Sequence, residues 1–186
     1  MTRSYVIDPT TGKLLTAKEW KDKAGADVLQ ADFVAIVPSD GSLPFMFPKK
    51  HLGEKEWQKA MEAAESFQCA LPEFALGTSW KLPTRKQGID IRDARSAGLD
   101  QLMKLIGGDI LDDLYWTREP WIAPGTTQEA CERIEEAWSS SRFTAHSAWF
   151  FNGYNGFAFS NSLYNAYRAL PVLLLDPVCV PDDADA

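Results

Sequence analysis

Residues 149–167 read WFFNGYNGFAFSNSLYNAY, and this stretch decides the fold class. Short aromatic runs separated by glycine and small residues are typical of strands joined by turns. Related runs occur at 115–117, 147–151, 156–160 and 166–175. Because these runs follow the main helical segments and do not alternate with them, the sequence predicts an α+β domain with a small, irregular antiparallel sheet.

The segments before these runs carry the apolar periodicity of helices. Apolar residues three or four positions apart share one helix face within 53–68 and again within 99–106. Thr84 and Gln87 have the spacing of a capping box, which predicts a helix that begins after Thr84. Gly88 weakens that helix, because glycine loses the most backbone entropy.

The N-terminal part predicts a strand followed by a hairpin. Residues 4–7 are β-prone and are closed by a turn that contains proline and glycine. Residues 33–37 and 43–47 flank a polar loop with glycine, which favours a hairpin. Pro44 and Pro48 predict that the second strand lies at an edge of its sheet, since proline cannot donate a hydrogen bond to a neighbouring strand.

A chain of 186 residues fits one domain. The N-terminal strand and hairpin occupy 1–50, and the core occupies 53–180. An insertion at about 118–146 interrupts the core and carries its own predicted helix, at 126–139. Residues 181–186 form a short acidic tail that we expect to be flexible.

Charge and hydropathy exclude several partners. The formal net charge of −7 repels a phosphate backbone, so nucleic acid is not expected as a partner. The longest apolar run, 169–175, is short and contains Pro171, so membrane insertion is not expected either. We expect no signal peptide, because the N-terminal stretch has no uninterrupted apolar core. We therefore expect synthesis in the cytoplasm, with virion association or export by a signal-independent route as the alternatives.

Motifs for catalysis and cofactor binding are absent from the sequence. It has no nucleophile elbow, no phosphate-binding loop and no zinc-protease helix motif. His51 and His146 could serve as acid or base groups, but neither has a partner at a recognisable spacing. The sequence therefore predicts no catalytic residue and no cofactor.

Cysteine and aspartate positions give no metal motif. The three cysteines are scattered, and a nucleophilic Cys69 or Cys131 would need a nearby histidine and an electropositive setting. Cys131 falls beside the apolar face of its predicted helix, so we expect it to be buried. Asp109, Asp112 and Asp113 lack the register of a calcium loop. A solvated loop is expected there, with a weak calcium site near Asp109 as the alternative.

The segment 149–167 has the composition of a contact surface. It combines phenylalanine and tyrosine with asparagine and serine and contains no charge. Rigid aromatic side chains supply contact area, while amides and hydroxyls supply adaptable hydrogen bonds. The alternative is that alternating aromatic residues such as Phe157 and Phe159 form the buried side of strands. We expect part of the segment in the core and part on the surface, and the predicted ligand-binding residues are Tyr154, Asn155, Asn161, Tyr164 and Asn165.

Four landmarks in the sequence resemble the DUF1566 family, also called the Lcl C-terminal domain. Trp80-Lys81-Leu82-Pro83-Thr84-Arg85-Lys86 is similar to its helix entry W-R-L-P-T-x-x-E, and Tyr115-Trp116-Thr117 to its Y-W-[ST]. Ala148-Trp149 with Asn152 and Gly156 is similar to A-W-x-x-x-F-x-x-G, and Tyr167-Arg168-Ala169-Leu170-Pro171-Val172 to the terminal strand Y-x-x-R-x-V. Together these landmarks cover about residues 80–175.

The resemblance implies a C-type-lectin-like fold with a small sheet and two main helices. It also implies that ligand-binding residues lie near the C-terminal strands. Trp80, Trp116 and Trp149 in these landmarks are large hydrophobes, so we expect them in the core beneath the sheet. Relatives of this family include hypervariable proteins made by diversity-generating retroelements, phage receptor binders and bacterial adhesins.

The chain departs from the family pattern in two places, and it lacks two motifs of other lectin-like proteins. In the family, the terminal arginine sits next to the last residue of the strand. Here Leu170 holds that place, and the arginine is Arg168. The insertion at 118–146 replaces a shorter loop. Glu119-Pro120-Trp121 lacks the amide ligand of calcium-dependent sugar-binding lectins, and the scattered cysteines lack the paired site of the lectin-like formylglycine-generating enzymes.

We expect a non-enzymatic recognition protein that binds a protein or glycan surface, in receptor binding or adhesion, through its C-terminal face. One rival is a structural virion or assembly component whose aromatic segment is a homo-oligomer interface. The other rival is an enzyme on the same scaffold that uses His146 or a cysteine.

Overall fold

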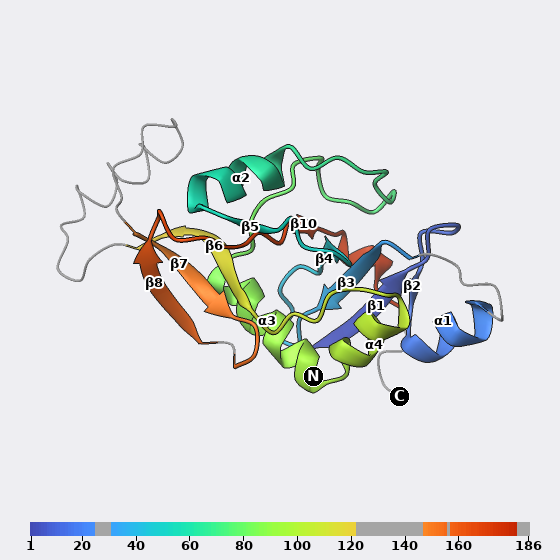
Figure 1. Cartoon of the computed structure of the whole chain (residues 1–186). Coiled ribbons are helices and arrows are strands. Elements are labelled where there is room, and N and C mark those ends of the chain that lie inside the picture. The colour runs from blue at the N-terminus through green and yellow to red at the C-terminus, as the bar shows by residue number, and fades with distance from the viewer. Residues whose placement is uncertain (25–30, 122–146, 156, 182–186) are drawn as a thin grey trace.

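The computed structural model describes residues 1–24, 31–121, 147–155 and 157–181. Within these residues the chain forms four α-helices and two five-stranded sheets, so the predicted α+β class is confirmed (Figure 1). Among the described residues no helix has the length and apolarity needed to span a bilayer.

The first sheet contains the N-terminal strands. Its order is β10-β4-β3-β1-β2, and all neighbours are antiparallel. The predicted hairpin is present as β3 and β4. The strands are β1 (Arg3–Ile7), β2 (Leu14–Leu15), β3 (Phe33–Val37), β4 (Phe45–Pro48) and β10 (Leu173–Leu174).

Strand β4 is not at the edge of its sheet, so the expectation drawn from Pro44 and Pro48 was wrong. Strand β10 pairs with its outer side, but only at Phe45 and Met46. Pro48 lies beyond this short pairing, opposite Phe33 of β3. No N–H group is needed from Pro48 on the β10 side, so proline is tolerated in an interior strand here.

The second sheet holds the C-terminal strands. Its order is β5-β9-β6-β7-β8. Strands β9 and β6 are parallel, and the other pairs are antiparallel. The strands are β5 (Glu54–Lys55), β6 (Leu114–Pro120), β7 (Ser147–Asn152), β8 (Ala158–Ser162) and β9 (Tyr167–Arg168).

The sequence predicted one small sheet, and the structure has two. The strand-like run 166–175 forms both β9 and β10, which belong to different sheets. Pro171 lies between them and interrupts the run. Periodicity within the run gives no sign of this division, because each of the two strands is only two residues long.

The helices are α1 (Ala17–Ala24), α2 (Trp57–Glu65), α3 (Arg85–Ser96) and α4 (Leu99–Leu105). The predicted capping box of α3 is present: Gln87 N donates to Thr84 Oγ1 at 3.1 Å, and Thr84 N donates to Gln87 Oε1 at 2.8 Å. Helix α2 is shorter than the periodic segment 53–68, because Glu54 and Lys55 form β5 instead.

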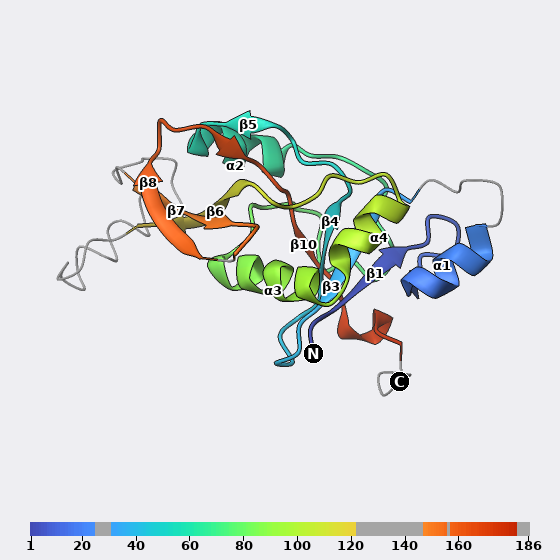
Figure 2. The ribbon, with the colours of Figure 1, turned by 60° about the horizontal axis from the view of Figure 1, so that its bottom comes forward.

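Helices α2 and α3 lie on opposite sides of the second sheet (Figures 1 and 2). Trp57 of α2 packs with Trp116 and Phe150 in one apolar cluster. The indole of Trp57 donates to Thr117 O, and that of Trp116 donates to Lys55 O, each at 2.8 Å. Tyr115 and Phe151 on the other face pack in the cluster that also contains buried residues of α3, α4 and the first sheet.

The three tryptophans expected in the core differ in burial. Trp80 and Trp116 are buried as predicted, whereas Trp149 is only half-buried, so its placement in the core was wrong. The side chain of Trp149 lies at the N-terminal end of α3, where the guanidinium of Arg85 stands 4.5 Å from the ring centroid. A cation–π contact therefore replaces apolar packing on that face.

Most of the predicted insertion lies outside the described residues. Residues 118–120 belong to β6, while the predicted helix 126–139, Cys131 and His146 fall in the part that is not described. The tail is described only at Pro181.

Candidate functional site

A row of aromatic rings crosses the second sheet from its buried centre to its outer strand. Neighbouring ring centroids are 4.6 Å apart for Trp116 and Tyr167, 4.6 Å for Tyr167 and Phe150, 5.8 Å for Phe150 and Phe159, and 6.3 Å for Phe159 and Phe157. Such spacings are those of attractive aromatic pairs. The row joins the packed core directly to the surface of β8.

The outer end of this row is exposed. Phe159 is opposite Phe150 in the register of β7 and β8, yet its side chain is 51% exposed whereas that of Phe150 is 7% exposed. Phe157 is 62% exposed. Helix α2 lies over β6, and β8 is the outermost strand beyond it (Figure 1). The alternative that Phe157 and Phe159 form a buried strand face was therefore wrong.

The predicted tyrosines lie in the turns at the two ends of β8. Tyr154 is 76% exposed in the turn before the strand, and Tyr164 is 83% exposed in the turn after it. Asn155 and Asn165 are exposed in the same two turns. We call the set Tyr154, Asn155, Phe157, Phe159, Tyr164 and Asn165 the outer aromatic surface.

Asn161 differs from the other four predicted residues. It is half-buried, and its side-chain Nδ2 donates to Tyr167 Oη at 2.6 Å. Its Oδ1 accepts from Ser162 N at 2.8 Å. Because both polar atoms already have partners inside the protein, Asn161 fixes Tyr167 in the aromatic row and offers little to a ligand.

The turn that carries Tyr154 is held by hydrogen bonds on both sides. Asn152 N donates to Phe157 O at 2.9 Å, and Tyr154 N donates to Asn152 Oδ1 at 2.8 Å. Gly153 N donates to Asp113 O at 2.8 Å. A turn fixed in this way loses little further entropy when a ligand binds.

Arg95 of α3 ties this turn to the helix. Its Nη1 donates to Gly153 O at 2.5 Å and to Leu111 O at 2.7 Å. The same guanidinium pairs with both carboxylate oxygens of Asp100, at 2.8 and 2.9 Å. A β-carbon on Gly153 would lie 2.1 Å from Leu111 O, so only glycine fits at this close approach. Sequence reasoning missed Arg95, because nothing in its spacing indicates contacts so distant along the chain.

Both ring nitrogens of His51 interact with other groups of the protein, so neither is available as a general base. Gly53 N donates to His51 Nδ1 at 2.9 Å, which makes Nδ1 the acceptor and leaves the proton on Nε2. Nε2 lies 3.6 Å from Asp109 Oδ2. Burial, with the positive charge of Arg168, lowers the pKa of His51. The neutral imidazole thus lacks a free lone pair, and these contacts fix the loop between β4 and β5.

The described cysteines are protonated thiols in apolar surroundings. Burial raises the pKa of the Cys69 thiol, and it raises the pKa of the Cys179 thiol to about 11. A reactive cysteine needs the opposite shift, since the thiolate is the nucleophile.

The aspartates that follow α4 make contacts within the protein. Asp109 accepts from Lys50 Nζ at 2.8 Å and from His51 N at 3.1 Å. Asp113 accepts from Leu114 N at 2.7 Å and pairs with Arg168 at 2.8 Å. In the described part of the chain, no three His, Cys, Asp or Glu side chains gather in an arrangement that would hold a metal ion.

Comparison of the sequence with models of known protein families gives no match, and comparison with curated proteins gives none either.

Proposed function

We propose that the protein is a non-enzymatic recognition protein that binds a protein or glycan surface through the outer aromatic surface. One observation carries the proposal: four aromatic side chains, each more than half exposed, gather on one strand and its two turns. Phe157 and Phe159 contact each other, and Tyr154 and Tyr164 flank them in the two turns. A single exposed apolar side chain is common on protein surfaces, whereas several on one part of the surface mark an interaction site.

The chemistry of this surface favours a ligand that is bound by shape and hydrogen bonding. Tyr154 and Tyr164 supply rigid anchors, and Asn155 and Asn165 supply amide groups beside them. The surface itself carries no charged residue. Its affinity should therefore depend only weakly on salt, in contrast to binding that charge pairs dominate.

The resemblance to the lectin-like Lcl C-terminal domain supports the same role, because ligand-binding residues in that family lie near the C-terminal strands. We propose receptor binding or adhesion by a phage or bacterial protein. A reverse-transcriptase gene and a near-copy of the codons for residues 149–167 beside the gene would support diversified binding. A cluster of tail genes alone would favour a virion component.

A pair of variants tests the surface directly. Fluorescently labelled protein is applied to a glycan array and to a displayed peptide library, and each ligand found is measured with Tyr154→Ala/Tyr164→Ala and with Val178→Ala. Val178 is 81% exposed in the short C-terminal 3₁₀ helix (Pro177–Cys179), away from β8. Each true anchor should contribute about 2 kcal/mol or more, so the double variant should lose binding while Val178→Ala keeps it. Equal affinity of the double variant and the wild type would refute the assignment.

One observation favours a second candidate, an oligomer interface in a virion or assembly component. Among the described strands none pairs with the outer side of β8, and the side chains of Phe159 in this strand and of Phe157 just before it are exposed. An uncovered apolar edge strand is a template for pairing with another copy. Light scattering should show a mass that rises with concentration in this case, and Phe159→Lys should abolish the rise. A mass that stays at the monomer value at every concentration would exclude the oligomer interface and favour the recognition role.

Turnover in an enzymatic assay that is lost in His146→Ala would support the third candidate, an enzyme on this scaffold.

A further inference from the structure

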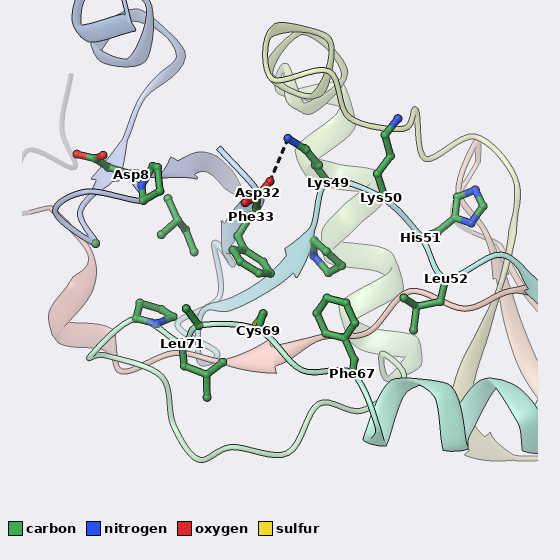
Figure 3. A pocket seen from close by; sticks show the side chains of 16 residues that line it. Asp8, Asp32, Phe33, Lys49, Lys50, His51, Leu52, Phe67, Cys69 and Leu71 are labelled. Carbon is green, nitrogen blue, oxygen red and sulfur yellow. Dashed lines mark ion pairs between the residues drawn. The ribbon is translucent and has the colours of Figure 1, made fainter. Parts of the chain in front are cut away.

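We propose that a second site, separate from the outer aromatic surface, binds a small uncharged molecule with an aromatic ring. The site is a pocket of about 490 Å³ between the first sheet and the segment that follows α2 (Figure 3). This volume falls within the range of small-molecule sites. None of the lining residues belongs to β7 or β8, so this proposal goes beyond the recognition function.

The pocket arises from the way the first sheet is covered. On one face the sheet packs against α3 and α4. On the other face it packs against the segment 67–82, which contains no helix and only isolated bridges at Ala75 and Lys81. An irregular segment fills the space over a sheet less completely than a helix does, whereas protein interiors are normally close-packed.

The walls of the pocket are mostly apolar. Strands β1, β3 and β4 contribute one wall, and the segment 67–72 contributes the other. In Figure 3 the side chains of Phe33, Phe67, Cys69 and Leu71 gather at the centre, while those of Lys50 and His51 point away from it. The apolar residues that line it include Ile7, Phe33, Pro48, Leu52, Phe67 and Leu71.

Two phenylalanine rings in the pocket are held in place by one buried tryptophan. Phe33 stacks on Trp80 with centroids 5.7 Å apart, and Phe67 meets Trp80 edge to face at 5.1 Å. Trp80 is 1% exposed. Rings fixed from behind present pre-oriented faces and edges to a ligand, and the preferred partner of such a wall is another aromatic ring.

The charges around the pocket are already neutralised. Lys49 pairs with Asp32 at 3.1 Å across its rim, and Lys50 pairs with Asp109 at 2.8 Å. Asp8 is buried and pairs with Lys23, which lies outside the lining. A charged ligand would lose its hydration without gaining a free counter-ion, so the site favours an uncharged one.

Three probes that share one ring system test the choice of ligand. Indole, indole-3-acetate and tryptamine are neutral, anionic and cationic, and saturation-transfer NMR titrations measure the binding of each to the full chain. Indole should bind saturably, and at least about tenfold more tightly than either charged probe. No saturable binding of indole, or equal binding of a charged probe, would overturn the proposal.

Cys69 reports the place of binding in the wild-type chain. It lines the pocket, whereas Cys179 does not. Alkylation by iodoacetamide at alkaline pH, where a fraction of each thiol is ionised, is followed peptide by peptide with mass spectrometry. It should slow at Cys69 by about tenfold when indole saturates the site, and it should not change at Cys179. Equal rates at Cys69 with and without indole would place the probe elsewhere and refute the site.

A matched pair of variants completes the test. Leu71→Trp should fill the pocket and lower the affinity for indole by about tenfold or more. Leu76→Trp makes the same change outside the lining, at a side chain that is 41% exposed, and should leave the affinity unchanged. If Leu71→Trp does not fold, Phe33→Leu removes one ring and should also weaken binding. Unchanged affinity in the folded pocket variant contradicts the proposal.

Tyr154→Ala/Tyr164→Ala should bind indole normally, which separates this site from the recognition surface.

Discussion

Gly88 of α3 lies directly against Phe151 of β7: a β-carbon on Gly88 would come within 2.7 Å of Phe151 Cγ. Phe151 is 1% exposed, so its ring has little room to move. Gly88 lowers the intrinsic stability of α3, but the absence of a side chain at this position lets α3 approach the second sheet closely.

Gly88→Ala should therefore destabilise the protein. Alanine improves helix propensity by about 1 kcal/mol, but overpacking of a filled core costs about 1–3 kcal/mol and should outweigh this gain. Urea denaturation measures the free energy of unfolding. Phe151→Leu should relieve the clash, so the double variant should be more stable than the sum of the single effects predicts. A Gly88→Ala protein as stable as the wild type would contradict this packing.

Asp8 should make stability depend on acid pH. Burial opposes ionisation of its carboxyl, but hydrogen bonds from Lys23, Thr11 and Thr10 outweigh this effect and lower the pKa of Asp8 from 3.8 to about 2. A carboxyl whose pKa is lower in the folded state stabilises the fold above its unfolded pKa, and it loses that contribution as the pH falls through the folded pKa. The contribution, about 2 kcal/mol near neutral pH, should disappear between about pH 4 and pH 2.

The comparison with Asp8→Asn isolates this group. Unfolding free energies of the two proteins should differ most near neutral pH and converge as the pH falls toward 2. A difference that stays constant over this range would show that the Asp8 carboxylate is not responsible.

Arg95→Lys should destabilise the turn that carries Tyr154. Lysine keeps the charge but cannot pair with both oxygens of Asp100 and also reach the carbonyls of Gly153 and Leu111. We expect a loss of about 2–3 kcal/mol in stability and faster hydrogen exchange of the Gly153 amide. Arg92→Lys is the matched control on the same helix: among the described residues, the Arg92 side chain pairs with the neighbouring Asp93 alone, and this exposed pair should matter little. Similar effects of the two substitutions would argue against a special role for Arg95.

Tyr154→Ala/Tyr164→Ala should fold as stably as the wild type. Both side chains are more than three-quarters exposed, so their removal should change the unfolding free energy by less than about 1 kcal/mol. Thermal and urea denaturation check this result. A large destabilisation would mean that these tyrosines support the fold instead of facing a ligand.

Local signals in the sequence predicted much of the secondary structure. The capping box at Thr84 and the apolar stripe within 99–106 correspond to α3 and α4. Helix α1 has the same kind of signal, since Thr16 and Glu19 form reciprocal hydrogen bonds at its start, but the pattern was overlooked there. It could have been found, because the spacing is that of Thr84 and Gln87.

Long-range pairing could not be predicted in the same way. The parallel pairing of Tyr115 with Arg168 joins residues that are distant in sequence, and no local pattern encodes it. For the candidate site, composition pointed to Tyr154 and Tyr164, which are exposed. The sequence left open whether Phe157 and Phe159 are exposed, because alternation shows which residues share a face, but not whether another element covers that face.

The short run from Tyr167 to Leu174 is a strand of the second sheet at one end and a strand of the first sheet at the other. Between these ends it bonds to Leu52, Gly53 and Lys81, and Ala169 and Leu170 are fully enclosed. During synthesis on the ribosome, neither sheet can receive its last strand until this run has left the exit tunnel. The fold should therefore close late and in a single step, and a nascent chain stalled before Tyr167 should remain sensitive to protease.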